Sequence, residues 1–274
     1  MIKKPLIALV FLFLLVISIV VNLPVITMVL NSFKSNTEIM TSTQVMPQQW
    51  TMENYLFVND KSAFWQQFIN SIIVTSLTVV ATILIGALAG YAISRFRTRL
   101  TGSFSVVLLL LQMFPFVLVM LPLFLAFRSL HLIDTLTGVI LIQTSISLPV
   151  SVLMFRGFFD SIPGEIEEAA WMDGCNRWST FTRIVLPISG PGIAAVSIFT
   201  ILLSWNDYII PNIFIKKESL MTLPLGLQMF MQQNATQWGG LTAAATLSAL
   251  PILIFLLFVQ KYIAYGAASG SVKG

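Results

Sequence analysis

Long apolar runs separated by shorter polar ones constrain this chain more than any other feature. Residues 5–30 include no charged side chain, and a helix rising about 1.5 Å per residue over that length crosses a hydrocarbon core of about 30 Å. A signal peptide has a shorter apolar region followed by a small-residue cleavage site. We therefore expect residues 5–30 to form a retained first spanning helix, with Pro24 as a candidate kink.

The composition indicates an integral membrane protein. Hydrophobic residues make up 57% of the 274 residues and charged residues only 9%, whereas about 25% of the residues of a soluble protein are charged. We expect a single transmembrane domain over residues 1–274. The basic residues are scattered, without interleaved aromatic side chains, which argues against nucleic acid as a partner. Cys175 is the only cysteine, which excludes an internal disulfide and a cysteine-based metal cluster.

Five further apolar segments predict an all-α fold with six transmembrane helices. Pro115 and Pro122 are expected to break the third span, which a membrane tolerates where neighbouring groups satisfy the freed carbonyls. We divide the chain into a first helix with an outer loop (1–67), a five-helix core (68–265) and a tail (266–274). The expected spans after the first are residues 69–93, 104–127, 136–155, 192–204 and 241–262.

Two glycines lie four residues apart in the second span. Gly86 and Gly90 form a GxxxG pattern, which lets the backbone of another helix come close. The alternative is that small residues are simply common in membrane helices, and the sequence leaves both interpretations open.

The basic residues predict which side of the membrane each loop faces. With six spans, both termini lie on one side, together with ten of the 15 basic residues. Because basic residues are enriched in cytoplasmic loops, we expect both termini to be cytoplasmic. The ten are Lys3, Lys4, Arg95, Arg97, Arg99, Arg156, Arg177, Arg183, Lys261 and Lys273, and the others are Lys34, Lys61, Arg128, Lys216 and Lys217.

The polar segment 161–187 lies between the fourth and fifth spans, on the predicted cytoplasmic side. Pro163 and the glutamates that follow it favour the start of a helix, because acidic groups complement the positive end of the helix dipole. Gly174 can adopt a positive φ and end that helix, with a second helix from about Asn176. The glutamates are Glu165, Glu167 and Glu168.

Helical periodicity assigns a face to several residues of this segment. In the first helix Glu165, Glu168, Ala169 and Met172 share a face. In the second helix one face holds Trp178, Phe181 and Val185, and another holds Arg177, Thr180 and Arg183. A helix lying on the headgroups is the alternative to a docking segment. Three glutamates would be poorly placed against an anionic leaflet, so docking to a protein partner is favoured.

The polar segment resembles a known motif. Glu168-Ala169-Ala170, then Gly174 after three residues and Ile184-Val-Leu186-Pro187 after nine more, match the EAA motif of permease subunits in bacterial binding-protein-dependent ABC importers. The chain as a whole looks like the maltose-type, carbohydrate-importing branch of that family. The shared features are six spans, a long first outer loop, a Trp-Asn-Asp stretch after the fifth span and a C-terminal Val-Lys-Gly. Trp171 is bulkier than the family's usual residue.

This resemblance implies that the polar segment is a cytoplasmic coupling helix between the fourth and fifth spans. In the family, the EAA segment sits in a groove of a cytoplasmic ATPase. Glu168 would pair with a basic residue of that groove, and Gly174 would make the turn. The tail, about residues 269–274, would reach toward the ATPase dimer interface.

The resemblance also implies the partners. The chain contains no GxxxxGK[ST] phosphate-binding loop, so we expect no cofactor, metal or catalytic residue in it, with ATP and Mg²⁺ on the ATPases. The implied partners are a second permease chain, two ATPase subunits, an extracytoplasmic solute-binding protein, membrane lipid and a carbohydrate substrate. The expected location is the bacterial inner membrane.

Polar side chains within spans are costly, so those present are candidates for the substrate path. Aromatic side chains beside them can stack on a sugar face, and interhelical hydrogen bonding or ordinary packing is the alternative for each. The resemblance implies that the partner permease makes most substrate contacts. The candidates are Gln112, Phe114, Gln143, Trp205, Asn206 and Asp207.

Other functions stay open at this point. Within the same family, a permease for glycerol phosphate or a polyamine is an alternative. An ion-coupled secondary transporter is disfavoured because the spans hold almost no charged residues. An intramembrane enzyme is disfavoured because His131, the only histidine, lies in a predicted outer loop and neither an HExxH nor a GxSxG pattern occurs.

Overall fold

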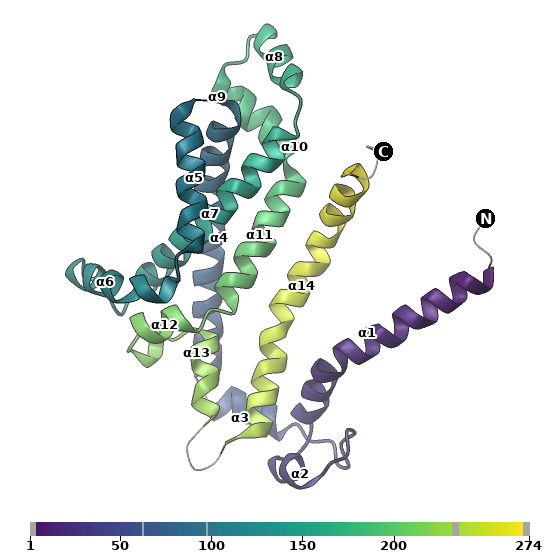
Figure 1. Ribbon diagram of the computed structural model, residues 1–274. Helices are drawn as coiled ribbons and strands as arrows, with labels where there is room; N and C mark the ends of the chain where they lie inside the picture. Colours follow the sequence, from purple (N-terminus) through teal and green to yellow (C-terminus); the bar gives the residue numbers. More distant parts are fainter. Residues whose placement is uncertain (1–3, 62, 97, 232–235, 271–274) are drawn as a thin grey trace. The chain divides into compact units, whose positions relative to one another are not determined.

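The structure, a computed structural model, describes residues 4–61, 63–96, 98–231 and 236–270 (Figure 1). Within these ranges the regular structure is helical, and an isolated bridge between Met231 and Thr236 takes the place of any strand. The all-α class expected from the sequence is confirmed. The backbone packs as two units: Met1–Trp65 with Gly226–Leu250 (unit 1), and Gln66–Leu225 with Pro251–Gly274 (unit 2).

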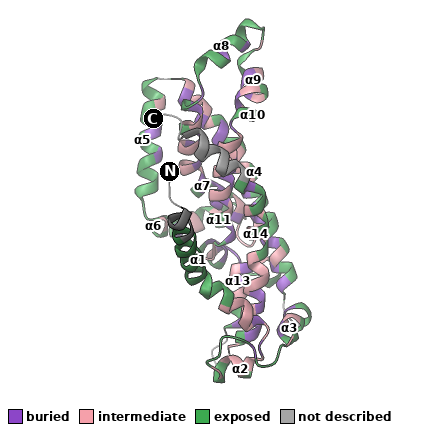
Figure 2. Cartoon of the chain, turned by 90° about the vertical axis from the view of Figure 1, so that its right-hand side faces the viewer, coloured by how far each residue is buried: buried purple, intermediate pink, exposed green. Residues whose placement is uncertain are grey.

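Unit 1 contains the first apolar helix and the polar loop that follows it. α1 spans Lys4–Ser32, and its residues 9–26 are all exposed (Figure 2). An apolar helix that is exposed on every face suits lipid rather than water, as predicted for the first span. The polar loop holds two short helices that the sequence did not predict, α2 (Asn36–Thr41) and α3 (Glu53–Lys61).

Side-chain hydrogen bonds of Ser35 and Asn54 hold this loop in unit 1. Ser35 caps α2 by accepting a hydrogen bond from the backbone N–H of Glu38 at 3.1 Å. The buried Asn54 amide of α3 donates to the carbonyls of Ser32 and Lys34 at 2.8 and 2.7 Å. These bonds satisfy carbonyls at the end of α1, which explains why α3 stays against it.

The core of unit 2 includes two clusters of buried apolar side chains, and both contain residues of α4 and α7. Apolar side chains of α4, α7 and α12 form one buried cluster, and side chains of α4, α7 and the segment leading into α11 form another. Its helices include α4 (Phe64–Arg95), α5 (Arg99–Met113), α6 (Phe116–Ser129), α7 (Leu136–Asp160), α11 (Gly190–Trp205) and α12 (Ile209–Phe214). Both α13 (Leu223–Leu227) and α14 (Trp238–Gly270) are divided between the units, α13 after Leu225 and α14 after Leu250.

The GxxxG glycines of α4 lie against α7. A Cβ atom at Gly90 would lie 2.6 Å from Cβ of Phe155 and 3.0 Å from the backbone nitrogen of Arg156. At Gly86 the nearest atom would be a ring carbon of Phe155, 3.3 Å away. Of the two interpretations that the sequence left open, the close helix approach is the one that the structure shows, and it is tightest at Gly90.

Four helices of the described residues are long and apolar enough to cross a membrane, and two bent helix pairs raise the number to six if each pair is one span. The four are Leu9–Ser32, Phe64–Arg95, Leu136–Asp160 and Trp238–Gln260. The bent pairs are Arg99–Met113 with Phe116–Ser129, at 99°, and Arg177–Ile188 with Gly190–Trp205, at 74°.

The third predicted span differs most from expectation, because it is two helices at nearly a right angle. Phe114 is extended, with a ψ of 125°, as a residue before proline prefers to be. Pro115 also lacks the N–H that a continuing helix needs. Pro122, the other expected break, lies inside α6.

Some predicted features lie outside the described residues. Lys3, Arg97 and Lys273 belong to this group, as do residues 271–274 of the predicted tail. The orientation inferred from the basic residues and the role of the tail stay predictions.

Candidate functional site

The polar segment folds as a helix, a turn and a second helix at one end of unit 2 (Figure 1). α8 covers Gly164–Met172, α9 covers Arg177–Thr180, and a π-helical turn at Phe181–Val185 leads into α10 (Leu186–Ile188). Gly174, between α8 and α9, has a φ of +86°. The predicted role of this glycine as a helix-ending residue is confirmed, since that backbone conformation is strained for other residues.

α8 has one buried and one exposed side. Glu167 and Ala170, three residues apart, are buried. The face predicted from periodicity is exposed, and Figure 2 shows most of α8 in the colour of exposed residues. It consists of Glu165, Glu168, Ala169 and Met172. The two adjacent glutamates, Glu167 and Glu168, therefore have opposite environments.

The second helix begins close to the predicted position. Asn176 caps it by accepting a hydrogen bond from the backbone N–H of Ser179 at 2.8 Å. Phe181 and Val185, which were placed on one face with Trp178, are both buried, but Trp178 is 64% exposed, and Thr180, placed on the other face, is buried. The predicted faces therefore do not match the burial at these two positions. The π-helical turn that follows is wider than an α-turn. This places Thr180 and Val185, five residues apart, on the same buried side.

The buried Glu167 carboxylate joins α8 to the end of α4. One oxygen accepts a hydrogen bond from the Tyr91 hydroxyl at 2.6 Å, and the other accepts one from Nε of Arg95 at 2.5 Å. A second guanidinium nitrogen of Arg95 donates to the carbonyl of Ile162 at 3.2 Å. Nothing in the sequence pointed to this contact, because 72 residues separate Arg95 from Glu167.

Arg177 of α9 contacts two aromatic rings, one just after the end of α4 and one in α8. Its guanidinium carbon lies 5.2 Å from the ring centre of Phe96 and 5.7 Å from that of Trp171. Cations are attracted to aromatic faces at such distances. Trp171, which departs from the family pattern, therefore has a local role in holding α8 to α9. Farther along the segment, Ile184 and Leu186 are half-buried and Pro187 is exposed.

A cleft of about 330 Å³ lies near the C-terminal end of α11. Its polar groups include three of the residues predicted for the substrate path, Gln143, Asn206 and Asp207. The Gln143 amide donates to the Asp207 carboxylate at 2.8 Å, and its oxygen accepts a hydrogen bond from the Ser204 hydroxyl at 2.6 Å. Phe116 provides an aromatic wall.

The other predicted path residues lie elsewhere. Gln112 and Phe114 are exposed at the bend between α5 and α6. Trp205 is only 5% exposed and packs edge-to-face on Phe68, with ring centres 5.9 Å apart. Gln112, Phe114 and Trp205 do not line the cleft. The roles proposed for all six residues stay predictions.

Asp134 fixes the loop that follows α12, a helix that supplies part of the cleft wall. Its carboxylate accepts hydrogen bonds from the backbone N–H groups of Lys216 and Lys217, the latter at 3.1 Å. The hydrogen bond from Lys216, joined by that from Lys217, lowers the pKa of Asp134 below its ordinary value despite partial desolvation. The backbone N–H of Asp134 donates a hydrogen bond to the carbonyl of Phe214 at 2.9 Å.

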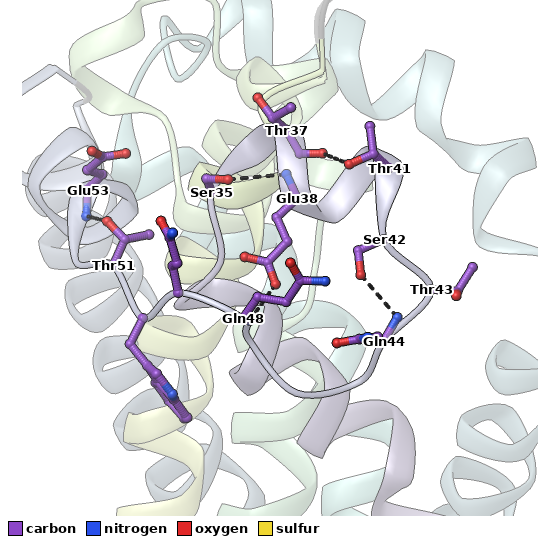
Figure 3. A pocket seen from close by; sticks show the side chains of 12 residues that line it. Ser35, Thr37, Glu38, Thr41, Ser42, Thr43, Gln44, Gln48, Thr51 and Glu53 are labelled. Carbon is purple, nitrogen blue, oxygen red and sulfur yellow. Dashed lines mark hydrogen bonds between the residues drawn. The ribbon is translucent and has the colours of Figure 1, made fainter.

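Unit 1 contains a separate polar hollow of about 740 Å³ (Figure 3). Hydroxyl, amide and carboxylate side chains line it, and several of them bond to each other's backbone. For example, the Glu38 carboxylate accepts the backbone N–H of Gln48 at 2.7 Å. The lining residues are Ser35, Thr37, Glu38, Thr41, Ser42, Thr43, Gln44, Gln48, Gln49, Trp50, Thr51 and Glu53. Among the described residues no group of three or more histidine, cysteine or acidic side chains is arranged to hold a metal ion.

The chain is similar in sequence to transport proteins. The sequence profile of the "Binding-protein-dependent transport system inner membrane component" family matches residues 82–267. The probable ABC transporter permease protein YurM of Bacillus subtilis (strain 168) is 39% identical over 270 residues, which cover 97% of this chain and 87% of that protein. The arabinooligosaccharides transport system permease protein AraQ of Halalkalibacterium halodurans is 31% identical over 262 residues, covering 94% of this chain and 93% of that protein.

A solved structure shares the fold. It is the crystal structure of a bacterial ABC transporter involved in the import of the acidic polysaccharide alginate. One of its chains matches with a TM-score of 0.83 and 22% sequence identity, covering 96% of this chain and 99% of that chain. This chain therefore shares its fold with a chain of that transporter.

Proposed function

The chain belongs to the family of binding-protein-dependent transport system inner membrane components, and we propose that it is the permease subunit of an ATP-driven carbohydrate importer. It is a multi-pass membrane protein and a transport component rather than an enzyme. In our proposal it forms half of a translocation path, and a second permease chain forms the other half.

The observation that most supports coupling to an ATPase is the exposure of the EAA-motif side chains. Glu168 and Ala169 point away from the chain on α8, while Glu167 and Ala170 hold the helix from the other side. An exposed surface with small and acidic side chains fits a protein groove better than an anionic membrane surface. We propose that α8 is the coupling helix and docks on one of two cytoplasmic ATPase subunits, which bind ATP and Mg²⁺.

The proposed topology has six spans and cytoplasmic termini, with each bent helix pair counted as one span. This places α8 in the cytoplasm and the hollow of unit 1 on the extracytoplasmic side. The hollow would then face the solute-binding protein on which the family depends. Closure of the ATPase dimer would move the coupling helices as rigid bodies and switch the path from inward-open to outward-open.

The substrate class rests on the relatives and on the cleft. AraQ is named for arabinooligosaccharides, and the structural neighbour imports alginate. The cleft combines amide and carboxylate groups with the Phe116 ring, which suits the hydroxyls and the apolar face of a sugar. We propose that Gln143, Asn206 and Asp207 contribute to the path. Binding of labelled sugars, glycerol phosphate and polyamines to the cognate binding protein would separate the carbohydrate proposal from its alternatives.

Copurification followed by reconstitution tests the proposed function. The tagged chain is solubilised in mild detergent, and the proteins that accompany it are identified by mass spectrometry. We expect a P-loop ATPase and a second multi-pass permease, and the reconstituted complex should import sugar only with ATP and the loaded binding protein. A chain that purifies alone and imports solute along an ion gradient, insensitive to vanadate, would contradict the proposal and favour a secondary transporter.

A further inference from the structure

The buried carboxylate of Glu167 has a different position from the motif glutamate beside it. Its side chain is 3% exposed, whereas the Arg95 side chain that pairs with it is 21% exposed. A buried charge is costly unless it is paired and hydrogen-bonded, and both Glu167 oxygens have a partner on α4. Glu167 and Ala170 are the buried residues of α8. Because the Glu167 carboxylate bonds to α4, it fixes the position of α8 relative to α4.

The contact continues from α4 into α7. Ser94, next to Arg95, donates its hydroxyl hydrogen to the Asp160 carboxylate at the end of α7, 2.6 Å away. A guanidinium nitrogen of Arg95 donates to the same hydroxyl oxygen at 3.1 Å. Glu167, Arg95, Ser94 and Asp160 thus form an unbroken polar chain from α8 to the ends of two predicted spanning helices.

The Tyr91 ring connects the polar chain to the apolar core. Its centre lies 4.7 Å from that of Phe181, in the π-helical turn, and 5.7 Å from that of Phe159 on α7. The hydroxyl of the same residue donates to Glu167. The ring is therefore held by packing, and its hydroxyl is oriented toward the carboxylate.

We propose that Glu167 is a positioning residue that makes α8 move as one body with α4 and α7, so that motion of the ATPase reaches the spanning helices. This inference rests on the proposed function. In this division of labour, Glu168 faces the ATPase and Glu167 faces the permease core. Loss of Glu168 weakens docking, whereas loss of Glu167 leaves docking intact and releases the docked helix from the core.

The test is the number of ATP molecules hydrolysed per sugar imported by the complete complex in proteoliposomes. For Glu167→Gln we expect ATPase activity to persist and this ratio to rise roughly tenfold or more, because a charge-assisted hydrogen bond shifts an equilibrium by about that factor. Tyr91→Phe removes one hydroxyl and keeps the ring packing, so the ratio should rise less. Glu168→Gln should lower hydrolysis and import together and leave the ratio unchanged.

Glu218→Gln is the control, since it makes the same chemical change at an exposed residue of the loop after α12. Thermal unfolding and subunit composition are measured for each complex. If Tyr91→Phe stays assembled with the wild-type ratio, and Glu167→Gln loses only assembly or thermal stability, Glu167 has a structural role alone and the inference is overturned. If the wild-type complex itself shows no ATP-driven import, it is the proposed function that fails.

Discussion

Gly174 gives the sharpest test of how the coupling segment is built. Its φ of +86° requires a left-handed backbone, and no heavy atom lies within 4 Å of a Cβ atom added there. A substitution therefore meets no steric obstacle, and its cost is the backbone conformation alone. That cost is about 1–2 kcal/mol for alanine, or roughly 5–30-fold in the population of the turn. Asparagine should cost less, and β-branched valine more.

We expect the loss of import to be smallest for Gly174→Asn, larger for Gly174→Ala and largest for Gly174→Val. The ATPase activity that remains in each variant should depend less on the loaded binding protein. Gly157→Ala is the matched control, because an added Cβ there also has no neighbour within 4 Å and φ is not positive. It should be neutral or stabilise the protein by about 0.4–1 kcal/mol. Equal effects of all three Gly174 variants, or a Gly174→Val protein with normal import and normal ATPase stimulation, would refute the reasoning.

Three further predictions concern other contacts of unit 2. Gly90→Ala should lower stability by about 1–3 kcal/mol through overpacking against α7, measured by thermal unfolding in detergent, whereas Gly102→Ala has open space and should not. Asp134 has a lowered pKa, so its stabilisation is present above the unfolded pKa and is lost as pH falls through the folded pKa. Asp134→Asn should flatten the dependence of Tm on pH below about pH 4, and an unchanged acid profile would contradict this. Gln143→Leu leaves the Asp207 carboxylate without its amide donor and should cost about 1–3 kcal/mol. It should also raise the apparent KM for uptake, and an unchanged KM would remove Gln143 from the path.

Features that depend on local chain chemistry were predictable from the sequence. The helical class follows from apolar length, and the turn at Gly174 follows from a glycine between two helical segments. The exposed face of α8 follows from a 3.6-residue period over a short regular helix. The spacing of Gly86 and Gly90 raised a close helix approach as one of two interpretations, and it named neither the partner helix nor the tighter position.

Features that depend on distant residues or on irregular helix geometry were not predictable. The Tyr91 and Arg95 partners of Glu167 are 76 and 72 residues away, and nothing local separates Glu167 from Glu168. The π-helical turn after Thr180 broke the periodicity on which the face of the second helix was predicted. Pro115 marked a break, but the 99° angle depends on how α5 and α6 pack afterwards.

The candidate path shows the same division. Composition singled out polar residues within apolar segments, and the structure brings Gln143 and Asp207 into contact across 64 residues. It leaves Gln112 exposed at a helix bend, because hydropathy does not reveal which side of a broken helix faces the core.

The most direct measurement is site-specific photo-crosslinking from α8 in native membranes. A photoreactive amino acid replaces Ala169, on the exposed face of α8, and in a control it replaces Ser129, which is exposed at the end of α6. If α8 is the coupling helix, the probe at Ala169 forms an adduct with a P-loop ATPase and the probe at Ser129 does not. Adducts from Ala169 with lipid alone, in membranes that contain the ATPase, would contradict the assignment of α8 as the coupling helix.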